Sequence, residues 1–224
     1  MAHHAVDERH ALAQTLRRTD PFAATLSGEW NAAQLLAHLV LRERSIVDAG
    51  RFVPVPALAR RADRAVADLA ADTPYEQLID VFDRGPTWRE VHGPVPTAWL
   101  WSLPAVREQA NVIEYLVHHE DVRRAEPDWQ PRLLPVDLQR TLWQRLHVLS
   151  RVTLRRLPLG VHLQWPAHGQ LASRLARRGA PVVTITGDPV ELTLFALGRG
   201  AVADVQFDGA PADVAIVREG QISF

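Results

Sequence analysis

The apolar residues in the first two thirds of the chain recur with helical spacing. Between residues 5 and 156 they return every three or four positions, which is the pattern of a helix with one buried face. The helices predicted from this spacing cover residues 5–18, 31–50, 59–72, 74–82, 105–125 and 136–156. The segment 59–72 is rich in arginine and aspartate and predicts a short exposed helix. Asn31 is a suitable N-cap for the second helix, and Thr73 followed by Pro74 predicts the start of the fourth.

The pattern changes after Pro158, where apolar and polar residues begin to alternate. The strands predicted from alternation and from β-branched runs cover residues 161–165, 182–186 and 202–207. Between the last two strands, residues 188–191 read Asp-Pro-Val-Glu, which predicts the capping box of a short helix that ends near residue 197. We therefore predict an α+β two-domain protein, with a four-to-five-helix bundle at residues 1–157 and a small α/β domain at residues 158–224.

Composition and charge narrow the class of protein. With 47% hydrophobic and 23% charged residues the chain is typical of globular proteins, and its formal charge of -1 argues against a general binder of nucleic acid or anionic membranes. The polar start carries no apolar export signal, and no run of about 18 apolar residues could span a bilayer. The sequence predicts a cytoplasmic protein.

Two residue types are absent, and their absence excludes several chemistries. The chain has no cysteine, which excludes disulfides, thiolate metal sites and a thiol nucleophile from the protein. Every one of its 25 basic residues is an arginine, which excludes Walker lysines and lysine Schiff bases. Chemistry is left to ten histidines, 26 carboxylates and the hydroxyl residues.

Three residues have the types and spacing of a metal site. Glu114 and His118 lie four residues apart on a predicted helix, so a carboxylate oxygen and an imidazole nitrogen could reach one ion, although a plain surface or core pair has the same spacing. His38 lies in an apolar stretch, where an imidazole needs a specific partner, and a backbone carbonyl would also serve. Two nitrogens and one oxygen with open positions suit catalytic zinc, and also non-haem iron(II).

Two segments carry a family resemblance. Residues 30–39, WNAAQLLAHL, and residues 111–125, NVIEYLVHHEDVRRA, resemble the mycothiol-dependent maleylpyruvate isomerase family and, more broadly, the DinB-like metal-binding helical bundles. Residues 187–199 resemble the small α/β domain of that family, so the likeness covers almost the whole chain. The resemblance implies that the metal ligands are His38, Glu114 and His118.

The neighbours of these ligands receive lesser roles. His119 could replace His118 as a ligand, but it is rotated by about 100° on the helix, and the register with Glu114 favours His118. We interpret His119, Glu120 and Asp121 as groups that support the ligands or hold domains together. The tryptophans are interpreted as residues of the core or of a cleft wall.

The resemblance implies a function as well as a site. It implies a divalent-metal enzyme, most simply a zinc enzyme, that uses a small thiol such as mycothiol for isomerisation or S-transfer on an electrophilic small molecule. Arg42 and Arg199 would place a substrate carboxylate, although Arg42 could instead form a surface ion pair with Glu43 or Asp48, and Arg199 could serve the helix end. A metal-dependent hydrolase and a non-catalytic metal or ligand-binding module are the alternatives, and an iron oxygenase is a weaker one. The sequence leaves the substrate, the metal and the oligomeric state open.

Overall fold

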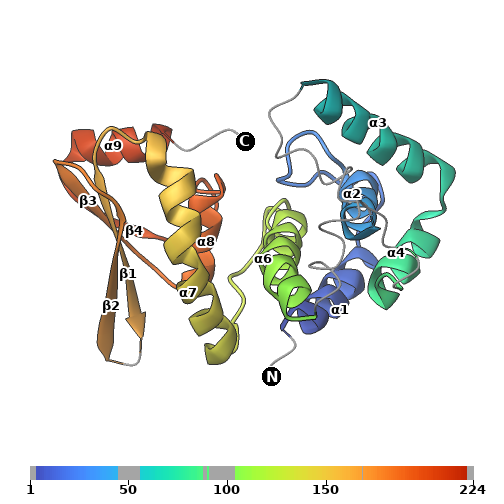
Figure 1. Ribbon diagram of the computed structural model, residues 1–224, viewed down its shortest axis with the longest axis horizontal. Helices are drawn as coiled ribbons and strands as arrows, with labels where there is room; N and C mark the ends of the chain where they lie inside the picture. The colour runs from blue at the N-terminus through green and yellow to red at the C-terminus, as the bar shows by residue number, and fades with distance from the viewer. Residues whose placement is uncertain (1–3, 45–55, 88–89, 91–103, 168, 221–224) are drawn as a thin grey trace. The chain divides into compact units, whose positions relative to one another are not determined.

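A computed structural model describes residues 4–44, 56–87, 90, 104–167 and 169–220 (Figure 1). The helices are α1 (His4–Leu16), α2 (Ala32–Arg44), α3 (Pro56–Asp72), α4 (Tyr75–Arg84), α6 (Pro104–Arg123), α7 (Val136–Thr153), the 3-10 turn η2 (Leu154–Arg156), α8 (Pro189–Ala196) and α9 (Pro211–Glu219). The strands are β1 (Gly160–Ala167), β2 (Gln170–Arg177), β3 (Val182–Thr186) and β4 (Gln206–Asp208). This mixture of helices with one four-stranded sheet confirms the α+β class.

The chain divides into two compact units, Met1–Trp129 and Gln130–Phe224. This division differs from the boundary predicted near residue 157, because α7 packs against α8 and β2. The apolar face of α7, with Trp143 and Leu146, belongs to the same core as the sheet. A division of the chain into independently folding domains at residue 157 stays a prediction.

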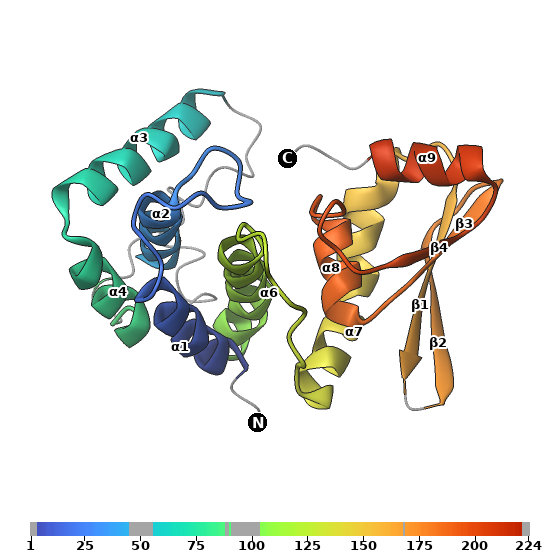
Figure 2. The same cartoon turned by 180° about the vertical axis from the view of Figure 1, so that it is seen from behind.

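The first unit is built from helices packed around apolar side chains. α1 packs against α6 and α4, and α2 packs against α3 and α4 (Figures 1 and 2). Its fully buried large side chains are Leu12, Leu16, Leu35, Leu36, Leu39, Leu78, Ile79, Phe82, Tyr115 and Leu116. The helix predicted at 59–72 is confirmed within α3 and is mostly exposed, but α3 is longer, with 17 residues, and it buries Ala62 and Val66. Alanine is small, and its buried positions are hard to see among so many charges.

The start of α2 is fixed by a capping box. The backbone N–H of Gln34 donates to Oδ1 of Asn31 at 2.9 Å, and Gln34 Oε1 accepts from the Asn31 N–H at 3.1 Å. This confirms Asn31 as the N-cap. α2 is described as far as Arg44, so its predicted continuation to Gly50 lies outside the described residues. The cap predicted at Thr73 was wrong, because α4 begins at Tyr75 with Pro74 as its N-cap.

The second unit contains a mixed sheet in the order β2-β1-β3-β4. β1 pairs antiparallel with β2 and parallel with β3, and β4 pairs antiparallel with β3. Its core includes Leu163, Trp165, Val183, Ile185, Leu192 and Phe195. The predicted strands at 161–165 and 182–186 are confirmed, but the strand predicted at 202–207 is only 206–208. The sequence interpretation missed β2 and α9.

The missed strand and the short helix each have a physical explanation. β2 carries arginines and small residues, and its residues are mostly partly exposed, so it shows no clean alternation. Asp188 is the N-cap of α8 and Pro189 follows it, as predicted. The Asp188 side chain makes no capping hydrogen bond, and Glu191 Oε2 accepts from the backbone N–H of Asp204 at 2.8 Å. Within the described ranges, no helix combines the length and apolar character needed to cross a bilayer.

Candidate metal centre

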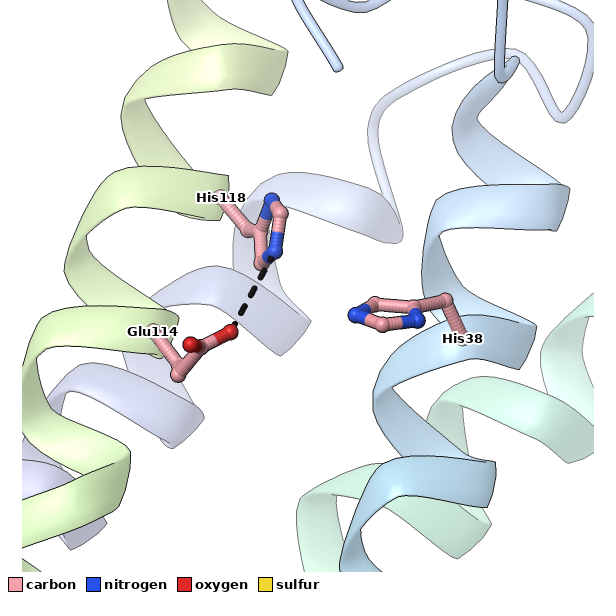
Figure 3. A group of neighbouring side chains, drawn as sticks. All are labelled: His38, Glu114 and His118. Atoms are coloured by element: carbon pink, nitrogen blue, oxygen red, sulfur yellow. Dashed lines mark ion pairs between the residues drawn. The ribbon is translucent and has the colours of Figure 1, made fainter. Parts of the chain in front are cut away.

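Three predicted ligands point toward one another between two helices (Figure 3). His38 lies in the middle of α2, and Glu114 and His118 lie on successive turns of α6. Each offers one donor atom, and these atoms all lie within 4.8 Å of one another. Nε2 of His118 and Oε2 of Glu114 are 3.5 Å apart. The structure therefore brings together the three residues that the sequence singled out, while their role as ligands stays a prediction.

The geometry of this group fits a small divalent cation. Zinc binds nitrogen and oxygen ligands at about 2.1 Å in a tetrahedron, so two ligand atoms are about 3.4 Å apart. The His118–Glu114 pair already has this separation, and His38 completes the group from the facing helix. Both imidazoles are buried and Glu114 is partly exposed. The donor set of two nitrogens and one oxygen suits zinc and leaves a position open to solvent or a substrate.

Asp121 fixes the orientation of His118. Nδ1 of His118 lies 3.0 Å from Oδ2 of Asp121, whose side chain is fully buried. Burial lowers the pKa of His118, but its contacts with Asp121 and Glu114 outweigh burial and raise that pKa. With the Nδ1 proton held by Asp121, Nε2 is the nitrogen that faces Glu114. The Asp121 carbonyl in turn accepts from the backbone N–H of Leu26 at 3.0 Å, which ties the loop before α2 to α6.

Glu114 is surrounded by positive and hydrogen-bonding groups. Burial raises the pKa of its carboxyl, but the hydrogen bond with His118 and the charges of Arg42, His118 and His38 lower that pKa to about 2. The carboxylate is therefore ionised at neutral pH, as a metal ligand must be.

Arg42 lies beside the group and is engaged by it. Its Nε is 3.4 Å from Oε2 of Glu114, and its Nη1 donates to Oδ1 of Asn111 at 2.8 Å. Both partners are on α6, one helical turn apart at most, so the guanidinium is held across the gap between α2 and α6. The predicted partner Asp48 lies outside the described residues, and Glu43 instead carries an ion pair with Arg9.

Aromatic contacts surround His38 in the group formed by His38, Glu114 and His118. The ring of Trp30 lies 4.8 Å from that of His38, and the two planes are tilted by 36°. His38 also meets His118 edge-on, with centroids 5.5 Å apart. Near this ring, the hydroxyl of Thr25 donates to the backbone carbonyl of Trp30 at 2.7 Å. Trp143 and Trp165 are core residues as predicted, while Trp88, Trp99 and Trp101 lie outside the described residues.

His119 faces α1, away from the group that contains His118. Its Nδ1 lies 2.7 Å from Oε1 of Glu8 and its Nε2 lies 2.8 Å from the hydroxyl of Thr15, both on α1. The structure therefore keeps His119 out of the group and uses it to join α1 to α6. Sequence reasoning missed these two partners, because nothing local in α1 indicates that they meet a residue more than 100 positions away.

The remaining predicted site residues lie elsewhere. Glu120 forms ion pairs with Arg123 and Arg124, at 3.0 and 2.6 Å. Arg199 follows α8 in the second unit, where its Nη1 donates to the carbonyl of Leu197 at 2.7 Å. This contact matches the helix-end role. A role of Arg199 toward substrate stays a prediction.

Removing the support of His118 is expected to weaken metal binding without abolishing it. Asp121→Ala leaves the Nδ1 proton of His118 without its acceptor, and such losses typically lower metal affinity by about 10- to 100-fold. Competition with a chromophoric chelator measures the zinc affinity of each variant. Asp128→Ala, an exposed aspartate of the same unit, should leave the affinity unchanged. Equal affinity of wild type and Asp121→Ala would show that this carboxylate does not orient a ligand.

The comparisons with known proteins bear on the fold. No protein-family model matches the sequence, and neither does any curated protein sequence. Among solved structures, the chain is similar to the crystal structure of the mycothiol-dependent maleylpyruvate isomerase, with a TM-score of 0.58 and 18% identity over 92% of this chain and 95% of that chain. A histidine-to-alanine mutant of that isomerase matches with a TM-score of 0.55 and 17% identity over the same shares. The resemblance found in the sequence motifs is thus confirmed at the level of the fold.

Proposed function

We propose that this protein is a divalent-metal-dependent enzyme, with zinc as its metal, that uses a small thiol cosubstrate of the mycothiol type. Its reaction is isomerisation of an electrophilic small molecule, or S-transfer, in which the thiol sulfur attacks such a molecule. The observation that carries the proposal is the convergence of His38, Glu114 and His118 within 4.8 Å of one another. The fold shared with a mycothiol-dependent isomerase supports the same reaction class.

Each residue of the proposed site has its own role. His38, Glu114 and His118 would hold the ion, and a bound divalent ion would supply Lewis acidity that lowers the pKa of a thiol. Asp121 holds the Nδ1 proton of His118, which keeps Nε2 directed at the site. The ring of Trp30 packs against that of His38.

Arg42 is proposed to position the substrate. A guanidinium has five N–H donors in a fixed plane and recognises carboxylates in bidentate fashion. Its contacts with Glu114 and Asn111 set the direction of that plane beside the ligands. An electrophile that carries a carboxylate would therefore be oriented with respect to the thiol. The absence of cysteine agrees with a nucleophile that arrives from solution.

Cobalt substitution tests the proposal with a readout that does not require the natural substrate. The full chain is loaded with Co²⁺ and titrated with mycothiol, and a thiolate-to-cobalt charge-transfer band is expected in the near ultraviolet. Glu126→Ala, an exposed change in the same unit, should keep the band, and His38→Ala should lose it. Thiol that leaves the cobalt spectrum of the wild type unchanged would contradict the proposal and favour a metal-dependent hydrolase, whose metal activates water.

A further inference from the structure

A pocket lined mainly by arginines lies in the second unit, between the end of α7 and the edge strand β2. It is open to solvent and has a volume of about 380 Å³. The described residues that line it are Arg151, Arg155, Leu175, Ala176, Arg177 and Arg178. Four of these six carry a guanidinium and none carries a carboxylate. A pocket of this size is at the lower end of the range for small-molecule sites.

An irregularity in β2 explains why consecutive residues line one hollow. In the register with β1, Val161 pairs with Arg177 and His162 pairs with Leu175, so Ala176 is an extra residue on β2. A regular strand would point Ala176 and Arg177 to opposite faces of the sheet. A bulge breaks that alternation and changes the direction of the side chains. Residues 175 to 178 therefore line the same pocket.

The arginines of this pocket are not neutralised by carboxylates among the described residues. Within the described part of the chain, Arg151, Arg155 and Arg178 form no ion pair with a carboxylate. Their field is felt nearby, because the charge of Arg151 lowers the pKa of His147, and burial together with Arg151 lowers the pKa of Arg174. This concentration of positive charge stands out in a chain whose net charge is -1.

Ordinary structural roles account for the single arginines but not for their gathering. A basic residue near the end of α7 complements the helix dipole, and charges on an edge strand such as β2 discourage pairing with other chains. Neither role requires the guanidinium groups to surround a common space. Arg177 is moreover held in place, since its Nε donates to the carbonyl of Leu157 at 3.1 Å.

We propose that this pocket binds the phosphate groups of a small phosphorylated molecule, such as a pyrophosphate or a phosphate ester. Guanidinium groups bind phosphate oxygens in bidentate fashion, and several of them around one hollow can neutralise a multiply charged anion. The volume of the pocket suits a compact ligand, and the near-neutral chain argues against a general polyanion binder.

Isothermal titration of the full chain with sodium pyrophosphate tests this proposal. The double variant Arg155→Gln/Arg178→Gln removes two exposed guanidinium groups and is expected to weaken binding by at least about 10-fold. The control Arg60→Gln/Arg61→Gln makes the same change of net charge on exposed residues of α3 and should bind as the wild type does. Binding that persists in His38→Ala separates this pocket from the proposed metal centre.

Three results would overturn the proposal. The first is unchanged pyrophosphate binding in the Arg155→Gln/Arg178→Gln variant, with an unchanged melting temperature showing that the variant is folded. The second is an equal loss in the α3 control, which would indicate unspecific attraction. The third is tighter binding, per phosphate, of a single-stranded RNA oligonucleotide, which would mark the surface as one for nucleic acid.

Discussion

Replacing His118 by alanine is expected to lower the affinity for zinc by about two to three orders of magnitude. The expectation follows from the share that each ligand contributes to the binding free energy of a zinc site. His118 offers Nε2 at 3.5 Å from the Glu114 carboxylate, and Asp121 fixes that direction. Competition between the protein and a chromophoric chelator measures the affinity.

The adjacent histidine provides a matched control for this prediction. His119→Gln removes an imidazole one residue along the same helix, but one whose two nitrogens contact Glu8 and Thr15 of α1. The variant is expected to lose stability and to keep the zinc affinity of the wild type, measured well below its melting temperature. The reverse outcome, with zinc lost in His119→Gln and retained in His118→Ala, would show that His119 and not His118 is the ligand.

Replacing Glu43 by alanine is expected to destabilise the protein by about 3–5 kcal/mol, because it removes the carboxylate that pairs with the buried guanidinium of Arg9. The Glu43 side chain is 1% exposed and its Oε1 lies 2.7 Å from Nη2 of Arg9, whose side chain is 11% exposed. The hydroxyl of Tyr115 also contacts both residues, and burial and the charge of Glu43 raise the pKa of that hydroxyl. Urea denaturation of each variant measures the free energy of unfolding.

Two further variants separate the loss of an ion pair from the loss of packing. Glu126→Ala removes an exposed carboxylate and should change the free energy of unfolding by no more than about 0.5 kcal/mol. Arg9→Met/Glu43→Leu replaces both charges with apolar side chains and should recover most of the stability lost in Glu43→Ala. If Glu43→Ala unfolds at the same urea concentration as the wild type, the buried pair contributes nothing to the fold.

The sequence predicted the candidate site because local spacing determines most of it. Helical periodicity places Glu114 and His118 on one face and turns His119 away from them by about 100°, and the structure has this arrangement. His38 was recognisable as an imidazole in an apolar stretch of helix. That the two helices bring these donors together follows from tertiary packing, for which only the family resemblance gave a guide.

What the sequence did not reveal depends on contacts between distant segments. The pair formed by Arg9 and Glu43 joins α1 to α2, and no periodicity within either helix indicates it. The same holds for the contact of Arg42 with Asn111. β2 was missed for a different reason, since a partly exposed edge strand with a bulge lacks the alternation by which strands are recognised.

The metal content of protein purified without an affinity tag tests the central claim most directly. Elemental analysis is expected to find one divalent ion per chain in the wild type and none in His38→Ala, because the ion needs a donor from α2 as well as two from α6. A full equivalent of metal in folded His38→Ala would contradict the account, since the two helices would then not share an ion.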